Sequence, residues 1–305
     1  MRIETPILVI IYKRPHLLTQ VLDVLRLVRP TTLYVAADGP RTSEERAACL
    51  QARSLIDAID WDCQVHRLFH ERNLGVRDAV SGAISWLFQH EEKGIILEED
   101  CLPSQSFFPF CQEMLTRYEQ DTRVMQVSGF NLLAQHTQQL PESYFFSDLA
   151  VNWGWATWSR AWQHYDVALS TWRQWREHPD FRSLYQRRAT DEFFRWRWDG
   201  IVAGKLPGSC LFQWDFARKI NAGLNIFPKV NLVRNIGFGA DVSHAEFKKP
   251  ANWLLRYHNQ ELEFPLLHKQ WVMKNRALDA IYEQTFFKKP WVLKLLRYLR
   301  KRLNK

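Results

Sequence analysis

The first 130 residues alternate between short apolar runs and amphipathic stretches, and this alternation limits the possible folds more than any other feature. The pattern predicts strands at 7–12, 33–37, 63–69, 94–97 and 124–128, with helices at 15–28, 46–59, 76–90 and 106–119. Strands that alternate with helices form a mostly parallel sheet with helices on both faces. The sequence therefore predicts an α/β fold built on such a sheet.

Three consecutive acids, Glu98, Glu99 and Asp100, follow the apolar run at 94–97. Carboxylates at the carboxyl end of a buried parallel strand stand where open α/β sheets hold their ligands. Hard oxygen ligands suit Mn²⁺ or Mg²⁺, and these ions usually hold phosphates as well as protein. The alternative is an acidic turn that caps a strand for solubility.

The expected strand order brings other polar residues to the same place. If the first three strands run outward and the fourth returns beside the first, the switch point lies between strands one and four. Arg14 would then face the same crevice as the acidic triplet, and Asp38 would border it. This is the expected position for a nucleotide with a metal ion at its phosphates.

Composition places the chain among soluble proteins of one large domain with an appendage, because 305 residues are 46% hydrophobic and 24% charged. The five cysteines lack a CxxC pair, so neither a disulfide framework nor a structural zinc site is indicated, and a reducing cytosol fits. Fourteen tryptophans mildly favour a carbohydrate partner. No apolar stretch reaches the length of a membrane span, and the amino terminus has the pattern of a first strand.

The positive charge is confined to the carboxyl terminus. Residues 286–305 carry eight basic side chains and no acid. The charge of this segment therefore equals the net charge of +8 of the whole chain. Leu295, Leu299 and Leu303 recur there at helical spacing, which predicts a basic amphipathic helix on an anionic membrane surface, or alternatively one docked on its own domain or a partner. The uncharged remainder argues against nucleic-acid binding.

Eight short motifs occur in one order: LVIIYKRP, AADGP, RNLGV, ILEEDCLPSQSFF, VSGFN, GWATW, QWDF and VSHAEF. Over residues 5–247 this order resembles the GT-A glycosyltransferases, and within them the inverting N-acetylglucosaminyltransferase I family and its bacterial relatives. The resemblance implies a metal-dependent inverting transfer from a nucleotide-sugar donor, a UDP-sugar such as UDP-GlcNAc, to a saccharide or lipid-linked glycan acceptor in cell-surface glycan synthesis. With the basic tail, it implies a cytoplasmic enzyme peripheral to the inner membrane.

The same resemblance implies roles for residues near the triplet. Asp100 would bind Mn²⁺ or Mg²⁺, while Glu98 and Glu99 would meet the donor sugar and the ribose. Arg14 and Asp38 would grip the nucleotide, with Asp38 accepting from the uracil imide; the alternative for both is a salt bridge at the strand ends. The sequence departs from the family here, because its triplet is Glu-Glu-Asp where Glu-Asp-Asp is usual.

Two further segments are implied to complete the site. Asp215 occupies the place of the family's catalytic base, with Trp214 beside it as a wall for the donor sugar, although the second acid that usually follows is missing. The alternative for Asp215 is a buried, hydrogen-bonded carboxylate. Arg234 begins a segment, 234–239, that resembles the loop ordering over the donor, and 152–158 resembles the segment beneath the donor sugar, with a core aromatic cluster as the alternative. Competitors for the role of base are Asp191, Glu192 and Asp199.

The predicted organisation is a GT-A domain at 1–250, an extension at 251–285 and the basic tail at 286–305. Two other functions compete. A sugar nucleotidylyltransferase would show a glycine-rich phosphate loop after the first strand, but the chain has no glycine before Gly39. A non-catalytic carbohydrate-binding or scaffold protein would suit the tryptophans and the tail, but it leaves the acidic triplet and Asp215 unexplained.

Overall fold

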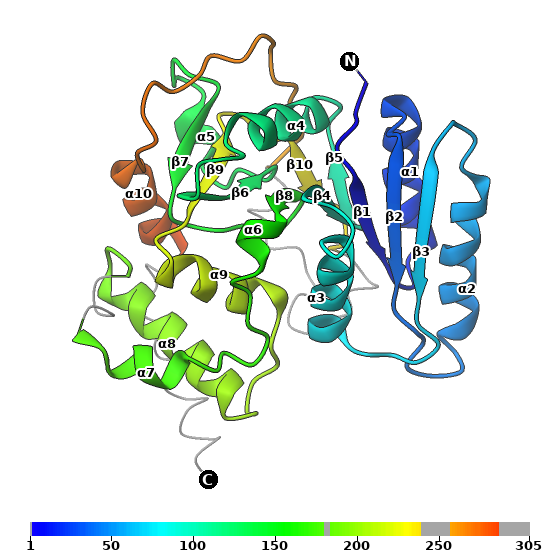
Figure 1. Ribbon diagram of the computed structural model, residues 1–305, viewed down its shortest axis with the longest axis horizontal. Helices are drawn as coiled ribbons and strands as arrows, with labels where there is room; N and C mark the ends of the chain where they lie inside the picture. The colour runs from blue at the N-terminus through cyan, green and yellow to red at the C-terminus, as the bar shows by residue number, and fades with distance from the viewer. Residues whose placement is uncertain (1, 180–183, 239–256, 287–305) are drawn as a thin grey trace.

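An eight-stranded sheet with the order β3-β2-β1-β4-β8-β6-β9-β7 forms the centre of the computed structural model (Figure 1), which describes residues 2–179, 184–238 and 257–286. A separate two-stranded sheet pairs β10 with β5. The strands are β1 (Ile7–Ile11), β2 (Thr32–Ala37), β3 (Gln64–Phe69), β4 (Lys93–Glu98), β5 (Cys101–Pro103), β6 (Val124–Ser128), β7 (Tyr144–Ser147), β8 (Trp155–Trp158), β9 (Leu224–Pro228) and β10 (Val233–Asn235).

Helices cover both faces of this sheet. They are α1 (Pro15–Val28), α2 (Arg46–Ser54), the short 3₁₀ helix η1 (Leu55–Ala58), α3 (Val76–Leu87), α4 (Phe107–Arg117), α5 (Ala134–Thr137), α6 (Ser159–Trp162), α7 (Trp172–Glu177), α8 (Arg188–Val202), α9 (Cys210–Ile220) and α10 (Arg276–Phe286).

The predicted fold class is confirmed. Strand β1 pairs in parallel with both β2 and β4, and β2 pairs in parallel with β3, so the chain does switch direction between β1 and β4. The other half of the sheet contains two antiparallel strands. Strand β8 lies between β4 and β6, and β7 pairs with β9 at the edge of the sheet. The predicted basic helix at 286–305 lies outside the described residues, apart from its end residue Phe286.

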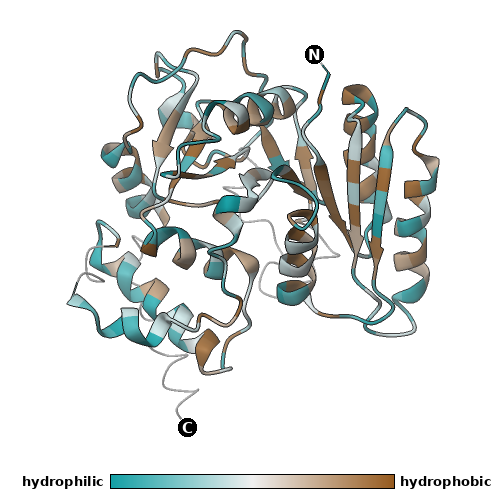
Figure 2. Cartoon of the chain, viewed as in Figure 1, coloured by the Kyte–Doolittle hydropathy of each residue, from teal (hydrophilic) through white to brown (hydrophobic). Residues whose placement is uncertain are grey.

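The alternation of side chains along β1 explains how one strand serves two cores. All five residues of β1 are buried. Ile7, Val9 and Ile11 join the hydrophobic cluster formed with α1, α2 and α4, whereas Leu8 and Ile10 join the cluster formed with α3 and α9. Successive side chains of a strand point to opposite faces, so a continuous apolar run is required here. Figure 2 shows β1 as one of the most apolar segments of the molecule.

Helices α7, α8 and α9 form a smaller third layer beside the sheet (Figure 1). Its core is aromatic, with Trp172, Trp198 and Phe216 buried against one another. Trp214 lies on the other side of α9, in the sheet-facing cluster with Trp155 and Trp162. Helix α9 therefore connects the third layer to the sheet.

The described part of the predicted extension packs against the rest of the chain. The Glu261 carboxylate accepts hydrogen bonds from the backbone amides of Gln105 and Ser106 at 3.1 and 2.8 Å, next to the start of α4. Helix α10 lies beside β7, where the Ser147 hydroxyl donates to Asp279 at 2.5 Å. Within the described residues, no helix combines the length and apolar character that crossing a membrane requires.

The Asp279 carboxyl makes stability depend on pH. It is 0% exposed, and burial together with the neighbouring Asp148 carboxylate raises the pKa of Asp279 to about 7. The ordinary pKa of an aspartate is about 3.9, so the folded state keeps this proton while the unfolded chain loses it. Its stabilising contribution is therefore complete below about pH 4 and is lost as the pH rises through about 7.

We expect Asp279→Asn to remove this dependence. In urea unfolding at pH 8 the variant should be more stable than the native chain by about 1–3 kcal/mol, and at pH 4 the difference should shrink toward zero. The exposed Asp57, replaced in the same way, serves as the control because its side chain keeps 74% exposure. An equal difference between native chain and Asp279→Asn at both pH values would contradict the shifted pKa.

Candidate active site

Two adjoining cavities open at the carboxyl ends of β1 and β4. The first cavity, of about 200 Å³, is lined by residues that include Tyr12, Lys13, Arg14, Asp38, Arg41 and Asn73. The second cavity, of about 290 Å³, is lined by residues that include Leu132, Val151, Asn152, Trp153, Trp155 and Leu211. Both cavities share Ile10, Val76, Val80 and Glu98. They therefore meet at the switch point of the sheet, which is where ligands of α/β folds bind.

Asp38 organises a turn at the rim of the first cavity. One carboxylate oxygen accepts from the backbone amides of Gly39 and Leu74, each at 2.8 Å, and the other accepts from the Asn73 side chain at 2.9 Å and the Gly75 amide at 3.1 Å. Four hydrogen bonds occupy the acceptor capacity of a carboxylate. The expected contact with a uracil imide therefore finds the carboxylate already engaged, and the alternative salt bridge is not formed with any of the described residues.

Gly39 lets this turn close. A methyl group on Gly39 would lie 2.4 Å from the carbonyl carbon of Arg72, which is a backbone atom that cannot move aside easily. The Asp38-Gly39 pair and the Asn73-Leu74-Gly75 turn thus form one rigid unit ahead of α3. The unit fixes the start of α3. Val76 and Val80 of this helix line both cavities.

Arg14 bridges two acids of the triplet. Its Nε lies 2.7 Å from Glu99 Oε1 and its Nη2 lies 2.8 Å from Asp100 Oδ2. Glu99 is only 2% exposed and also accepts from the Tyr12 backbone amide at 2.6 Å. The alternative for Arg14, a salt bridge at the strand ends, is what the structure contains. Arg14 and Glu99 hold the end of β1 to the end of β4, and both also line the first cavity, so their contacts with the donor stay predictions.

Glu98 is the acid of the triplet that lines both cavities. It is the last residue of β4, and the residue as a whole is half-buried there. Burial of the carboxyl, with the Asp100 carboxylate as the next cause, raises the pKa of Glu98 to about 8. Its position agrees with the contact to the donor that the resemblance implies.

The triplet fits a divalent cation that is held mainly by the phosphates of a bound substrate. Asp100 uses Oδ2 for the ion pair with Arg14, while among the described residues Oδ1 has only a weak contact with the Cys101 thiol at 3.7 Å. One guanidinium faces two carboxylates, so a surplus of negative charge remains for a cation. In the part of the chain that the structure describes, no three His, Cys, Asp or Glu residues gather into a metal cage. Mg²⁺ and its relatives are commonly bound by one or two carboxylates plus phosphates, which this arrangement can provide.

Strand β10 brings the segment after Arg234 against the triplet. Arg234 pairs with Leu102 of β5, and the Ile236 amide donates to the Asp100 carbonyl at 2.8 Å. A methyl group on Gly237 would lie 2.2 Å from Asp100 Oδ2, so a larger residue there would displace the Asp100 carboxylate. The described residues do not place Arg234 among the lining of either cavity. Residue 239, the last of the expected segment 234–239, lies outside the described residues.

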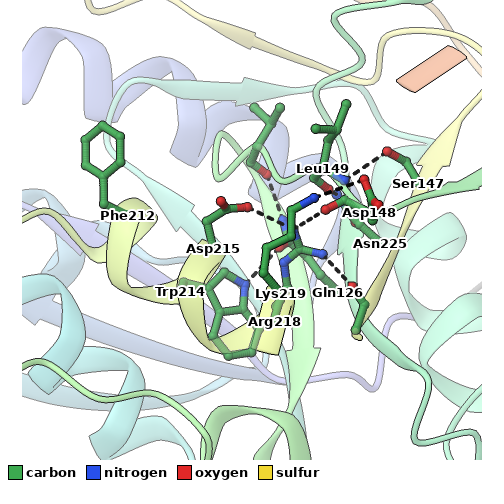
Figure 3. Close-up of polar contacts among 12 residues, drawn as sticks. Gln126, Ser147, Asp148, Leu149, Phe212, Trp214, Asp215, Arg218, Lys219 and Asn225 are labelled. Carbon is green, nitrogen blue, oxygen red and sulfur yellow. Dashed lines mark hydrogen bonds and ion pairs between the residues drawn. The ribbon is translucent and has the colours of Figure 1, made fainter. Parts of the chain in front are cut away.

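Asp215 was expected as the catalytic base and Trp214 as a wall for the donor sugar. Both residues are absent from the lining of the two cavities. The Asp215 carboxylate is 3% exposed, lies 3.2 Å from Arg218 Nη2 and accepts a hydrogen bond from the Tyr185 hydroxyl. Figure 3 shows Asp215 and Arg218 directed toward each other from α9. Trp214 is 0% exposed and donates to Gln126 at 2.8 Å. The alternative of a buried, hydrogen-bonded Asp is what the structure contains, and the role as base stays a prediction that this placement does not support.

The network around Asp215 supports the wall of the second cavity instead. Arg218 is 0% exposed and also donates to the carbonyls of Asp148 and Gly223 at 3.2 and 3.0 Å. Gln126, which accepts from Trp214, donates in turn to the Val151 carbonyl at 2.8 Å. Helix α9 therefore fixes the segment between β7 and β8 that lines the cavity. Arg218, three positions after Asp215 on one helix, was the signal that could have revealed this pairing.

Comparisons with known proteins give a weak likeness. No protein-family model matches the chain, and no curated protein matches it. The mannosyltransferase PcManGT from Pyrobaculum calidifontis in complex with GDP-Man and Mn²⁺ is 15% identical at a TM-score of 0.36, over 52% of this chain and 45% of that one. GalNAc-T7 with UDP, GalNAc and Mn²⁺ is 11% identical at a TM-score of 0.44, over 74% and 43%.

A nucleotidyl-transfer enzyme shows likeness of the same order. The UDP-glucose pyrophosphorylase complexed with UDP-glucose is 10% identical at a TM-score of 0.35, over 74% of this chain and 90% of that one. The chain spans less than half the length of the two glycosyltransferases. All these TM-scores lie below 0.5, so the comparisons carry no functional assignment for this protein.

Proposed function

We propose that this protein is a metal-dependent glycosyltransferase of the GT-A type that uses a nucleotide-sugar donor. The observation that carries the proposal is the meeting of the two cavities at Glu98, next to Asp100 and at the switch point between β1 and β4. Each cavity alone, at about 200 and 290 Å³, falls below the range of about 300–1,000 Å³ in which small-molecule sites lie. A ligand that spans both, such as a nucleotide sugar, suits their combined volume.

The first cavity suits the nucleotide end of such a donor. Lys13 and Arg41 line it, and both are held in place by Glu45, at 2.6 and 2.7 Å. These cations can attract the diphosphate while keeping a fixed geometry. Because Asp38 is saturated, the structure favours no particular nucleobase, and a UDP-sugar such as UDP-GlcNAc is proposed from the sequence resemblance.

The acidic triplet suits the departing diphosphate. A bound Mn²⁺ or Mg²⁺ would act as a Lewis acid that stabilises the charge on the leaving group. Asp100 would hold it through the carboxylate oxygen that has no strong contact. Glu98, at the joint of the cavities, would contact the donor sugar, and Arg14 and Glu99 would keep the ends of β1 and β4 in register.

Inversion at the anomeric carbon requires a carboxylate that takes the proton of the acceptor hydroxyl. The sequence assigns this role to Asp215, which the structure pairs with Arg218. Glu98 is the only carboxylate among the described residues that line the second cavity. The proposed acceptor is a saccharide or lipid-linked glycan, and the proposed location is the cytoplasmic face of the inner membrane, reached through the basic tail.

A donor-turnover assay tests the proposed function. The full chain is incubated with a panel of UDP- and GDP-sugars, with Mn²⁺ or with EDTA, and release of the free nucleoside diphosphate is followed by mass spectrometry. We expect slow, metal-dependent hydrolysis of at least one donor even without an acceptor. Formation of a nucleotide sugar from a nucleoside triphosphate and a sugar 1-phosphate would instead identify a nucleotidylyltransferase, and the absence of both reactions would favour a non-catalytic carbohydrate-binding protein.

A further inference from the structure

The side chain of Asn152 in the second cavity has unused hydrogen-bonding capacity. Both Oδ1 and Nδ2 are shielded from solvent, and neither has a hydrogen-bond partner among the described residues. No other described carboxamide has both of its atoms in this state. Buried polar groups are normally paired, because leaving them unpaired is unfavourable. Asn152 is one of the residues that line the cavity that the proposed donor has to enter.

The backbone around Asn152 is fixed on both sides. The Val151 carbonyl accepts from Gln126 Nε2 at 2.8 Å and from Ser128 Oγ at 2.9 Å. Two residues after Asn152, the Gly154 carbonyl accepts from the Gly129 amide at 2.7 Å. Gly154 has a φ of +62°, and a methyl group on it would lie 2.6 Å from a Val233 methyl group. The backbone that carries the unpaired carboxamide is therefore held in place by its neighbours, as is typical of a preorganised binding residue.

The remaining lining of the second cavity defines the kind of ligand. Leu132, Trp153 and Trp155 contribute apolar and aromatic surface, while Glu98, Asn152, Ser209 and Tyr282 contribute polar groups. Sugar rings present apolar C–H faces, which pack on aromatic rings, and hydroxyl groups, which need hydrogen-bond partners. An apolar aromatic cavity with a few polar groups suits a single sugar ring.

We propose that the second cavity binds the transferred sugar of the donor and that Asn152 is the residue that recognises its hydroxyl groups. Nδ2 would donate to one hydroxyl and Oδ1 would accept from another, so that the carboxamide is satisfied only when the sugar is bound. This inference rests on the proposed function and assigns the sugar-recognising residue within it.

The test compares Asn152→Leu with the native chain by calorimetric titration of UDP and of a panel of UDP-sugars in Mn²⁺. Leucine has nearly the same shape and removes both unpaired atoms. We expect the Kd of the best UDP-sugar to rise roughly 10- to 100-fold, as for the loss of two hydrogen bonds, while the Kd of UDP stays unchanged. The melting temperature should stay equal or rise, because no hydrogen bond within the protein is lost.

Asn131→Leu provides the matched control for stability. The Asn131 carboxamide is also buried, but it donates to Thr137 and the Pro228 carbonyl and accepts from the Leu133 amide, at 2.8–2.9 Å. Its replacement should lower the melting temperature, in contrast to Asn152→Leu. An unchanged Kd for every UDP-sugar in Asn152→Leu, an equal loss for UDP and UDP-sugars, or a marked fall in its melting temperature would each overturn the inference. A native chain that binds neither UDP nor any UDP-sugar would overturn the proposed UDP-sugar donor first, and the inference with it.

Discussion

Asp100→Asn should lower the rate of donor turnover at saturating Mn²⁺ by at least about 100-fold, because it removes the charge expected to hold the cation at the diphosphate. Asparagine keeps the size of the side chain and an acceptor for Arg14, whose Nη2 lies 2.8 Å from Asp100 Oδ2. The substitution therefore changes the charge of the site more than its packing. The rate is measured as release of nucleoside diphosphate, with the melting temperature recorded in parallel.

The control for this prediction is Asp57→Asn, which removes a carboxylate that is paired with Arg67 at an exposed place. Asp57→Asn should retain full turnover and an unchanged response to Mn²⁺. If Asp100→Asn retained the native rate and the native dependence on Mn²⁺, the acidic triplet would be a structural turn. The melting temperature distinguishes a loss of metal binding from a fall in rate that is caused by global unfolding.

Arg218→Met should destabilise the protein by about 3–5 kcal/mol, because it leaves the buried Asp215 carboxylate without its cation. Arg218 is 0% exposed and also donates to the carbonyls of Asp148 and Gly223. Methionine occupies a similar volume, so the main loss is electrostatic. Urea unfolding at pH 7 measures the change in the free energy of unfolding.

The double variant separates the charge from the carbonyl contacts. Adding Asp215→Asn to Arg218→Met removes the uncompensated charge, so the double variant should be more stable than Arg218→Met alone. Additive losses in the double-mutant cycle would contradict a direct Asp215–Arg218 pair. Asp215→Asn alone also tests the sequence assignment: a catalytic base would show a fall in turnover of about 10²–10⁴-fold with little change in stability.

The regular first half of the chain was predictable from sequence because its elements are locally determined. Continuous apolar runs at β1 and β4, a proline at the start of α1 and the Asp38-Gly39 turn each act within a few residues. The order β3-β2-β1-β4 is the one that the sequence argument assumed, with the fourth strand returning beside the first.

The second half was not predictable in the same way. Strand β8 takes up the aromatic segment at 155–158 and lies antiparallel between β4 and β6, although no local pattern specifies those partners. Its position depends on contacts with residues about 30 or more positions away, such as the Thr157 hydroxyl that donates to the Met125 carbonyl at 2.7 Å. Long-range contacts of this kind are not visible in a short window of sequence.

The site shows the same division. Sequence correctly brought Arg14 and the triplet together, because strand ends meet at one edge of a parallel sheet. It did not reveal that Asp38 is saturated by the turn at 73–75 or that Asn152 is unpaired, because hydrogen-bond satisfaction depends on the three-dimensional surroundings of each side chain. Asp215 occupies the expected position in the order of the motifs, but helix α9 directs its carboxylate toward Arg218.

The most direct test is calorimetric titration of a UDP-sugar panel into the native chain and into Asp100→Asn, each with and without Mn²⁺. A nucleotide-sugar site at the acidic triplet predicts that the native chain binds at least one donor only when Mn²⁺ is present, and that Asp100→Asn loses this binding. Donor binding that needs neither Mn²⁺ nor Asp100, or no binding of any donor by the native chain, would contradict the proposed site.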